Sequence, residues 1–373
     1  MLMRPIRVLC VFGELNRGGA ETMCMNLYRN INRNIVQFDF VKHTFEVGCY
    51  EEEIKQLGGE IYTAPKYCVF NHFEYDNWWR RHLREHPEHV IIHAHYITMA
   101  AVYLAIAKKN GRVTIAHSHS TNPRGSFLSQ IIKRLYIVPV ARVADYRLSC
   151  SLPAGECVFG RKEFSVLKNA IEVERFRFDP SIRDSIRKQW RLEDCFVLGT
   201  VGSITKVKNP FGLLDIFERV YRKNSGARLL WVGEGDLREE IEELVQARGL
   251  QGVVHFTGMR EDVECMMQAM DVFVFPSLWE GLGMAVIEAQ AAGLTCVCSD
   301  NVPREVNVSG LCSFFSLGQI EQWVNCIMAI SGKRQDMTEI VRKAGYDVRD
   351  TGKKMEAFYC EINESMRTEV RCS

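Results

Sequence analysis

Residues 271–300 read DVFVFPSLWEGLGMAVIEAQAAGLTCVCSD, in which two apolar runs flank a glycine-containing turn and an apolar helical stretch. The runs at 271–277 and 294–300 are almost continuously apolar, as expected of strands that a parallel sheet buries on both faces. The residues after Gly283 are mostly good helix formers. A strand, a helix and a second strand in this order predict a doubly wound α/β fold with a parallel sheet.

The same alternation of apolar runs and amphipathic stretches extends over most of the chain. Further apolar runs, each followed by a glycine or polar turn, lie at 6–12, 90–95, 113–118, 146–151, 164–169, 196–203, 227–233 and 253–258. We expect two Rossmann-like domains, at 1–172 and 173–345, and a C-terminal helix at 346–373. The charged segment 170–192 contains Pro180 and no apolar run, and we interpret it as the linker between the domains.

Length and composition narrow the class of protein. A chain of 373 residues suits two domains, and 47% hydrophobic with 25% charged residues is ordinary for a soluble protein. No apolar run approaches the roughly 18 residues of a membrane-spanning helix. The first residues, MLMRPIRVLCVFG, have the pattern of a first strand rather than of a signal peptide. We therefore expect a cytoplasmic protein.

Charge is unevenly distributed, although the net charge is only +1. Residues 1–172 contain 22 lysines and arginines against 16 acidic residues, whereas the remainder contains 25 against 30. A basic first half suits the inner face of a membrane, and chance asymmetry on a solvated surface explains it equally well. The amphipathic stretch 126–143 has two interpretations as well, core packing or peripheral membrane contact. We expect no nucleic-acid partner.

The 14 cysteines include no C-x-x-C pair. The closest two, Cys296 and Cys298, lie in an apolar run and have the pattern of strand residues. Free thiols in a large cytosolic protein are usually buried small hydrophobes. We therefore expect no structural zinc, no other metal site and no cofactor.

Two glycine turns follow predicted strands, where the ligands of doubly wound folds bind. Gly18 and Gly19 open the first helix, and their backbone lets an anion approach the helix amides, although a tight turn without ligand is the alternative. No G-x-x-x-x-G-K-[ST] loop is present, so ATP or GTP hydrolysis is not expected. Gly233 belongs to a truncated dinucleotide fingerprint in which Arg238 replaces the last glycine, which disfavours a nicotinamide dehydrogenase.

A third turn, VGSITKVKNP at 201–210, places lysines just before a helix that starts near Pro210. Cations at a helix N-terminus are unfavourable unless an anion binds there too. Lys206 and Lys208 therefore indicate a phosphate site, and a solvated loop is the structural alternative.

Four histidines lie near the ends of two predicted strands. His117 ends the run at 113–118 and His119 follows it, so this pair either lines a sugar pocket or is structural. His93 and His95 alternate along another run and share a face, where we favour a structural role. A metal site needs ligands at matching distances, which spacing alone does not provide.

Two glutamates carry the strongest functional signal. Glu280 lies in the turn after the first quoted run, and Glu288 lies about one and a half turns into the helix. A carboxylate with apolar neighbours on both sides needs a partner, and the vicinal hydroxyls of a ribose are good donors. Gly281 and Gly283 free amides at the helix start for phosphate or sugar. A helix with one internally satisfied glutamate is the structural alternative.

The E-x7-E spacing from Glu280 to Glu288 resembles the signature of the retaining glycosyltransferases of family 4, which have the GT-B fold. The resemblance is closest to the capsule and exopolysaccharide branch and extends over almost the whole chain. The other matching segments are GGAE at 18–21, IAHSHS at 115–120, SLPAGECVFG at 151–160, NAIEVERF at 169–176, VGSITKVKNP at 201–210, WVGEGDLR at 231–238 and FTGMREDV at 256–263.

The resemblance implies an organisation for the whole molecule. Two Rossmann-like domains would face a cleft, with the acceptor domain at 1–172 and the nucleotide-sugar donor domain at 173–345. The C-terminal helix at 346–373 would pack back on the N-terminal domain. The donor would be a nucleotide diphosphate sugar, with UDP the expected carrier, and the acceptor a saccharide or a lipid-linked saccharide.

The resemblance also implies roles for individual residues. Three are predicted to be catalytic: Lys208 neutralises the diphosphate leaving group, Glu280 holds donor-sugar hydroxyls, and His117 faces the sugar near the reacting carbon. Glu288 is predicted to bind the ribose. The other predicted donor-binding residues are Gly281, Leu282, Gly283, Ser203, Lys206, Gly18, Gly19, Met259, Arg260, Gly233 and Asn169.

One position departs from the family pattern. Relatives usually have arginine where this chain has Ser203, paired with the lysine that corresponds to Lys208. Loss of a charge-assisted bond to phosphate costs about 1.5–3 kcal/mol. Lys206 is the candidate substitute, and without one the donor affinity or the activity would fall.

The implied chemistry needs no metal ion. Cleavage of the anomeric C–O bond builds charge on the β-phosphate, so catalysis depends more on charge stabilisation there than on a strong base. Lys208 and helix N-termini supply it without Mg²⁺, and no D-x-D triplet is present. The resemblance implies retention, with the acceptor attacking on the face from which the leaving group departs.

Two other function classes share these features. A nucleotide-sugar epimerase or a glycan phosphorylase would use the same cleft, and product analysis with and without acceptor separates them from a transferase. A non-catalytic nucleotide-sugar binder is the other alternative because of Ser203, and a donor-hydrolysis assay identifies it.

Overall fold

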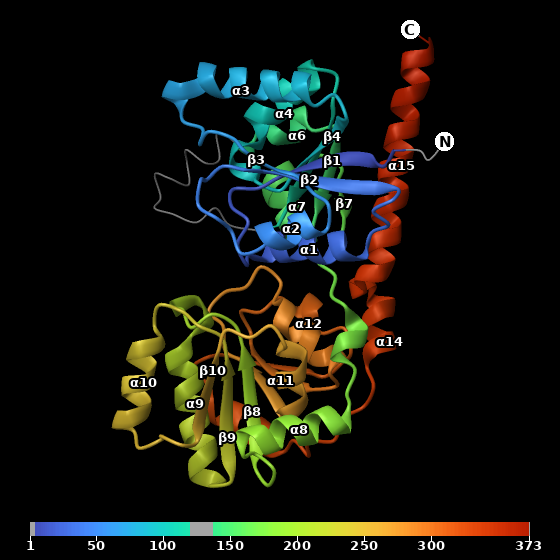
Figure 1. Ribbon diagram of the computed structural model, residues 1–373. Helices are drawn as coiled ribbons and strands as arrows, with labels where there is room; N and C mark the ends of the chain where they lie inside the picture. Colours follow the sequence, from blue (N-terminus) through green and yellow to red (C-terminus); the bar gives the residue numbers. More distant parts are fainter. Residues whose placement is uncertain (1–3, 120–136, 373) are drawn as a thin grey trace. The chain divides into compact units, whose positions relative to one another are not determined.

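The computed structural model describes residues 4–119 and 137–372, which form two compact units. Unit 1 comprises Met1–Ile171 and Asp347–Ser373, and unit 2 comprises Glu172–Tyr346. Each unit is a parallel sheet with helices on both faces (Figure 1). Every helix in the described ranges is too short or too polar to cross a membrane.

The sheet of unit 1 has seven strands in the order β3-β2-β1-β4-β5-β6-β7. The strands are β1 (Ile6–Val11), β2 (Val36–Lys42), β3 (Ile61–Thr63), β4 (His89–Ala94), β5 (Val113–Ser118), β6 (Tyr146–Ser149) and β7 (Ser165–Val166). The helices are α1 (Gly19–Asn30), α2 (Glu51–Gln56), α3 (His72–Glu85), α4 (Ala100–Lys109), α6 (Val140–Val143), α7 (Leu152–Phe159) and α15 (Val348–Cys372). The amphipathic stretch 126–143 lies outside the described residues up to residue 136.

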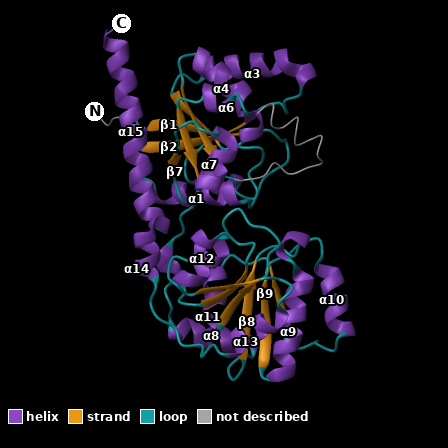
Figure 2. Cartoon of the chain, turned by 180° about the vertical axis from the view of Figure 1, so that it is seen from behind, coloured by secondary structure: helices purple, strands orange, loops and turns teal. Residues whose placement is uncertain are grey.

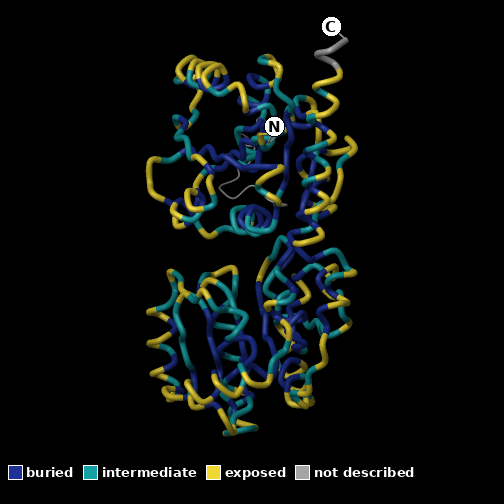
Figure 3. Tube along the Cα trace, turned by 45° about the vertical axis from the view of Figure 1, so that its right-hand side comes forward, coloured by how far each residue is buried: buried dark blue, intermediate teal, exposed yellow. Residues whose placement is uncertain are grey.

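Helices cover both faces of this sheet (Figure 2). On one face α1 and α15 pack against the strands, with Tyr28 and Tyr359 in the shared core. On the other face lie α3, α4, α6 and α7, where Trp79 stacks on Tyr103 with ring centroids 5.2 Å apart. The strands are buried while the outer sides of the helices remain exposed (Figure 3). The near-continuous apolar runs reflect this burial on both faces.

Strands β2, β3 and β13 are missing from the sequence prediction. β2 reads VQFDFVK, and all seven of its residues are buried although Gln37 and Asp39 interrupt the apolar run. Asp39 is tolerated because it accepts hydrogen bonds from Arg7 Nε at 2.6 Å and from His89 Nε2 at 2.9 Å. Since His89 lies 50 residues further along the chain, the local pattern does not reveal this partner.

The sheet of unit 2 has six strands in the order β10-β9-β8-β11-β12-β13. The strands are β8 (Phe196–Val201), β9 (Ala227–Val232), β10 (Val254–Gly258), β11 (Val272–Phe275), β12 (Thr295–Ser299) and β13 (Cys312–Phe315). The helices are α8 (Pro180–Trp190), α9 (Pro210–Lys223), α10 (Arg238–Ala247), α11 (Val263–Ala269), α12 (Met284–Ala291), α13 (Ile320–Met328) and α14 (Thr338–Val341). The quoted stretch thus folds as β11, α12 and β12, as predicted.

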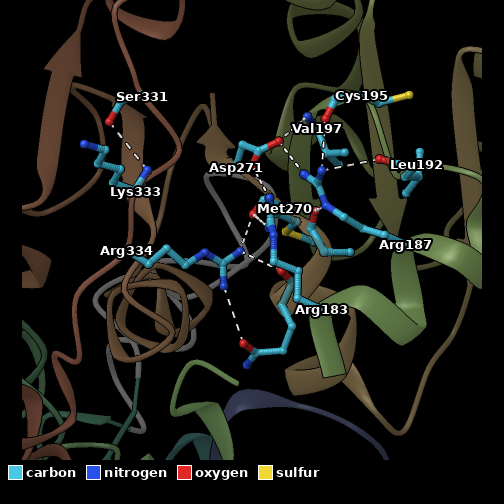
Figure 4. Close-up of polar contacts among 12 residues, drawn as sticks. Arg183, Arg187, Leu192, Cys195, Val197, Met270, Asp271, Ser331, Lys333 and Arg334 are labelled. Carbon is cyan, nitrogen blue, oxygen red and sulfur yellow. Dashed lines mark hydrogen bonds and ion pairs between the residues drawn. The ribbon is translucent and has the colours of Figure 1, made fainter. Parts of the chain in front are cut away.

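The chain passes from unit 1 to unit 2 at Ile171 and Glu172, inside the segment 170–192 that we interpret as the linker, but the rest of this segment belongs to unit 2. Much of it forms α8, whose first turn is capped by Asp179 accepting from the amide of Ser181 at 2.8 Å. Arg183 and Arg187 of α8 donate to the buried carboxylate of Asp271 at 2.5 Å each (Figure 4). These two arginines therefore face inward and attach α8 to the residue before β11, within unit 2.

Candidate active site

The order of strands in unit 2 reverses between β8 and β11, and the loops after these two strands carry most of the predicted site residues of this unit. The loop after β8 contains Ser203, Lys206 and Lys208, and the loop after β11 contains Glu280. Doubly wound sheets bind ligands at such a switch point, outside the carboxyl ends of the strands. The predicted donor residues thus lie where the topology of unit 2 favours a ligand.

Backbone contacts hold these two loops together. The amide of Leu278 donates to the carbonyl of Val207 at 2.8 Å, and Asn209 Nδ2 donates to the carbonyl of Pro276 at 3.2 Å. Asn209 has a left-handed φ of 54° and also caps α9, because its Oδ1 accepts from the amide of Gly212 at 3.3 Å. One asparagine therefore fixes both the start of α9 and the loop after β11.

An ion pair spans the same two loops. Lys208 Nζ lies 2.5 Å from Glu280 Oε1 and 4.7 Å from the centroid of the Phe275 ring. The side chains of Lys208 and Glu280 are 28% and 11% exposed, so the ammonium group remains accessible. An ammonium group has three donors, and Lys208 can bind Glu280 while donating to a further oxygen. The structure thus brings together two of the three predicted catalytic residues.

The backbone before α12 is open. A Cβ atom on Gly281 would meet nothing within 4 Å, and Gly283 has a φ of 94°, which favours glycine immediately before the helix. The side chain of Leu282 is buried, with 6% exposed, so this segment presents its backbone rather than a side chain. The first amides of a helix have no acceptor within the helix and attract anions.

Glu288 lies on α12, and within the described part of the chain its carboxylate has no hydrogen-bonding partner. Burial and the negative charge of Glu264 raise the pKa of Glu288 to about 7, although Arg175 opposes this shift. Arg175 itself pairs with Glu264 at 2.5 Å. The structural alternative, in which Glu288 is satisfied by a partner within the protein, therefore does not hold. Its carboxylate is available to the hydrogen-bond donors of a ligand.

Gly233 has a packing role that accounts for the GEG sequence without a ligand. Its φ is 140°, and a Cβ atom there would lie 2.1 Å from the carbonyl oxygen of Gly202. A Cβ atom on Gly235 would lie 2.5 Å from the carbonyl oxygen of Ile204. The Gly233 amide already donates to the carbonyl of Gly258 at 3.0 Å. Donor binding by Gly233 therefore stays a prediction.

The remaining predicted residues of unit 2 lie at the surface. Ser203 and Lys206 are exposed, and no described carboxylate pairs with Lys206. Met259 is exposed, whereas Arg260 donates twice to Asp262, at 2.8 and 2.7 Å. Lys206 and Met259 are thus accessible to a ligand, while Arg260 would first have to release Asp262.

Four predicted residues belong to unit 1. Gly18 and Gly19 start α1, where a Cβ atom on Gly18 would lie 2.2 Å from a carboxylate oxygen of Glu21. Asn169 is buried, and its Oδ1 has no hydrogen-bonding partner among the described residues. His117 has no exposed surface, so its predicted contact with a donor sugar stays a prediction.

Unit 1 also contains a cavity of about 470 Å³, beside the turn that follows β1. It is lined by Phe12, Gly13, Glu14, Glu21, His43, Thr44, Lys66, His95 and Tyr96, most of which follow β1, β2 and β4. His43 is fixed there by a contact of Nε2 with the Tyr75 hydroxyl at 2.8 Å. Because β2 was not recognised as a strand, the residues at its carboxyl end were not considered.

Comparisons with known proteins agree with this architecture. Residues 182–344 match the family described as "Glycosyl transferases group 1". The chain is 32% identical over 361 residues to the putative glycosyltransferase EpsF of Bacillus subtilis (strain 168), covering 92% of this chain and 93% of EpsF. It is 23% identical over 368 residues to the capsular polysaccharide biosynthesis glycosyltransferase CapH of Staphylococcus aureus, covering 95% and 98%.

Solved structures share the fold. The structure of Anabaena HepE in complex with UDP superposes with a TM-score of 0.76 at 19% identity, covering 96% of this chain and 100% of HepE. WaaG, a glycosyltransferase involved in lipopolysaccharide biosynthesis, gives a TM-score of 0.68 at 18% identity, covering 95% and 99%. These likenesses confirm the GT-B fold. Together with the match to EpsF along nearly its full length, they show that this chain belongs to the group 1 glycosyltransferases, glycosyltransferase family 4.

Proposed function

We propose that this protein is a retaining, metal-independent transferase that moves a sugar from a UDP-sugar to a saccharide or lipid-linked acceptor during synthesis of a cell-surface polysaccharide. The observation that carries the proposal is the Lys208–Glu280 pair beside the open backbone before α12. The names of relatives support the acceptor class. One is an Escherichia coli galactosyltransferase named for UDP-Gal and a GlcNAc-diphosphoundecaprenol, 28% identical over 177 residues.

Each part of the site suits one part of such a donor. The ammonium group of Lys208 and the first amides of α12 match the negative charge of a diphosphate. Glu280 holds Lys208 in place and offers a carboxylate oxygen to sugar hydroxyls. Glu288, which lacks an internal partner, matches the two hydroxyls of a ribose.

The chemistry follows from where charge develops. As the anomeric C–O bond breaks, its electron pair moves to the β-phosphate oxygen, and the positive charge of Lys208 stabilises this leaving group. The acceptor hydroxyl forms the new bond on the same face and gives its proton to the departing phosphate. This route retains the anomeric configuration without a metal ion or a covalent enzyme intermediate.

The cavity of unit 1 supports binding of a polar acceptor. It combines carboxylates and a cation with aromatic side chains, a mixture that provides both hydrogen bonds and apolar ring faces. Within it, burial raises the pKa of Glu21, and burial lowers the pKa of His43. The neutral His43 ring donates from Nδ1 to the Phe12 carbonyl at 2.9 Å, and its Nε2 lies 2.8 Å from the Tyr75 hydroxyl, so it forms part of the cavity wall and has no donor left for a ligand.

Incubation with nucleotide sugars tests the proposal. We expect UDP-sugars to raise the melting temperature and one of them to yield a new glycoside only when an acceptor saccharide is present. Formation of an epimer, or of a sugar 1-phosphate with inorganic phosphate, would identify one of the other enzyme classes. Donor binding without any turnover would identify a non-catalytic binder.

Glu288→Gln should weaken donor binding by about 10–100-fold, because neutral Gln cannot form charge-assisted bonds to the ribose. Wild-type affinity should also fall about tenfold between pH 8 and pH 6, since the free carboxylate has a pKa of about 7 and protonation removes an acceptor. Titration calorimetry at both pH values measures the two effects. An equal pH dependence in the variant would contradict the ribose-binding role.

Contact with an anionic membrane forms a further part of the proposal. Phe70, in the short turn before α3, and Phe73, in the first turn of α3, are exposed, and the same helix carries exposed Arg81 and Arg84. Exposed aromatic side chains next to cations are typical of helices that bind at a lipid interface. A lipid-linked acceptor would be presented at such a surface.

Phe70→Ser with Phe73→Ser should reduce flotation with vesicles of phosphatidylcholine and phosphatidylglycerol several-fold, because both apolar anchors are lost. Met328→Ser, at an exposed apolar position of unit 2, is the matched control and should float like the wild type. Equal flotation of the wild type with phosphatidylcholine alone, or no loss in the double variant, would refute membrane contact through α3.

A further inference from the structure

A second cavity of unit 1, of about 930 Å³, lies along α3 beside the edge strand β3. Its other walls come from Thr63 and Pro65, where β3 ends, and from Phe45 in the loop after β2. Ligand pockets in proteins usually have volumes of about 300–1,000 Å³. This cavity is near the upper end of that range, so it suits a ligand of several rings rather than one small ion.

One face of α3 lines the cavity. The side chains on this face are spaced three or four residues apart, as the helical repeat requires. The opposite face of α3 carries Tyr75, Trp79 and Leu83, which are buried in the core of unit 1. The residues that α3 contributes to the cavity wall on its outer face are Glu74, Asn77, Trp78, Arg80, Arg81 and Arg84.

The wall that α3 provides is positively charged, with three arginines against Glu74. Arg80 Nε donates to Asp76 at 2.6 Å, which occupies that guanidinium group. Arg81 and Arg84 are exposed, and no residue in the described ranges pairs with either of them. The guanidinium fork matches the two oxygens of a carboxylate. Arg81 and Arg84 are therefore free to bind negative groups of a ligand.

Aromatic and neutral polar side chains complete the cavity. The ring of Trp78 lies flat on that of His82, with centroids 5.1 Å apart and an interplanar angle of 4°, so its orientation is fixed. Phe45 is 85% exposed, and Asn77 and Thr63 offer an amide and a hydroxyl group. A sugar has apolar ring faces and polar hydroxyl edges. The mixture of aromatic, amide and hydroxyl groups suits both parts of a sugar.

This cavity and the smaller one, proposed above to bind the acceptor, share two loops of unit 1. In the loop after β2, Thr44 lines the smaller cavity and Phe45 lines the larger one. In the loop after β3, Lys66 lines the smaller cavity and Pro65 the larger one. A saccharide whose end lies in the smaller cavity therefore has its preceding sugar units beside the larger cavity.

The two shared loops are held in place. The amide of Ala64 donates to the carbonyl of Lys42 at 2.9 Å, which joins the starts of both loops. Lys42 Nζ pairs with Glu51 at 2.5 Å and donates to the carbonyl of Glu46 at 2.8 Å, and Lys42 and Glu51 are both buried. The loop that carries Phe45 is thus closed by a buried ion pair.

We propose that the cavity along α3 is an extended acceptor subsite, which binds acidic sugar units that precede the unit to be glycosylated. This inference rests on the proposed transferase function and names the chemical class of its acceptor, a saccharide with carboxylate groups. Arg81 and Arg84 bind the carboxylates, while Trp78 and Phe45 pack against the sugar rings. The subsite selects the acceptor and takes no part in the chemistry of transfer.

Titration calorimetry with three probes tests the subsite. The probes are hexagalacturonate, an acidic hexasaccharide; maltohexaose, a neutral chain of equal length; and inorganic diphosphate, an anion without sugar. We expect hexagalacturonate to bind at least about tenfold more tightly than the other two, with an affinity that falls as salt is added. No binding of hexagalacturonate, or equally tight binding of either other probe, would overturn the proposal.

Arg81→Gln with Arg84→Gln should lower the affinity for hexagalacturonate by about 10–100-fold, because two charge-assisted contacts are lost. The melting temperature should not change, since neither arginine has a partner in the described structure. Lys353→Gln with Lys354→Gln removes two exposed cations from α15 and is the matched control, which should bind like the wild type. Unchanged affinity in the arginine variant, or an equal loss in the lysine variant, would overturn the subsite.

Two further measurements on the same proteins separate this inference from the other proposals. UDP-sugars should raise the melting temperature of the arginine variant as they do that of the wild type. A wild type that binds UDP-sugars but not hexagalacturonate would refute the subsite alone, whereas failure to bind any nucleotide sugar would refute the transferase function. Reduced vesicle flotation of the arginine variant without loss of hexagalacturonate affinity would assign both arginines to lipid binding and overturn the subsite.

Discussion

Replacement of Lys208 by alanine lowers the turnover of sugar transfer by about 10²–10³-fold, the usual cost of losing one group that stabilises transition-state charge. The ammonium group is the only cation that the described structure fixes between the loops after β8 and β11. Its loss also leaves Glu280, 11% exposed, without a counter-ion beside the position proposed for the diphosphate. The loss of the positive charge and the unpaired negative charge of Glu280 thus both destabilise the charge that develops on the leaving group.

The measurement is the turnover number at saturating donor, with the melting temperature to verify folding. Lys223→Ala is a matched control, since Lys223 lies at the far end of α9 and pairs with Glu321 at 3.3 Å. The control should keep wild-type turnover. Retention of more than about a third of wild-type turnover by the Lys208 variant would contradict its role in leaving-group stabilisation.

Asp39→Ala should lower the free energy of opening of unit 1 by about 3–5 kcal/mol, because it leaves the buried His89 and the partly buried Arg7 without their partner. Asp39 is fully buried and accepts hydrogen bonds from Arg7 at 2.6 and 2.5 Å, from His89 at 2.9 Å and from the amide of Glu60 at 2.9 Å. Burial alone would raise the pKa of Asp39, but the hydrogen bonds from His89 and Arg7 lower it. The carboxylate is therefore charged and central to β1, β2 and β4.

Hydrogen exchange of peptides from these strands measures the opening of unit 1 separately from unit 2. Asp76→Ala is the matched control, since Asp76 pairs with Arg80 at the surface at 2.6 Å. A surface pair contributes about 0–1 kcal/mol, so the control should be nearly neutral. An effect of Asp39→Ala below about 1 kcal/mol would show that the network is not required for the stability of unit 1.

Much of the fold and of the donor site follows from local sequence patterns. The stretch 271–300 gave β11, α12 and β12, because both strands are buried on two faces and both therefore read as apolar runs. The same stretch singled out Glu288, and its lack of a partner in the structure fits a carboxylate among apolar neighbours. The sequence places Lys208 and Glu280 in loops that follow two predicted strands, and the strand order seen in the structure makes these strands neighbours at the switch point.

The features that the sequence did not reveal depend on partners far along the chain. β2 was missed because Asp39 interrupts its apolar run, and its partners Arg7 and His89 lie on other strands. The charge of the segment 170–192, Pro180 and its lack of an apolar run predict a linker and do not reveal α8, in which Arg183 and Arg187 bind the buried Asp271. The sequence shows which residues are charged, but whether a charged side chain faces water or a buried partner depends on the fold.

The histidines at the ends of β4 and β5 show the same limit. Spacing placed His93 and His95 on one face and left the role of His117 open. The pairing of β4 with β5 is what brings the three rings together, and α15 adds Tyr359 from the other end of the chain. No local pattern encodes such a juxtaposition.

A crystal structure of the protein with UDP bound is the most direct test of the central claim. We predict that a phosphate oxygen lies within hydrogen-bonding distance of Lys208 Nζ and that both ribose hydroxyls donate to the carboxylate of Glu288. UDP bound at another place, with these two side chains making no contact with it, would contradict the proposed donor site.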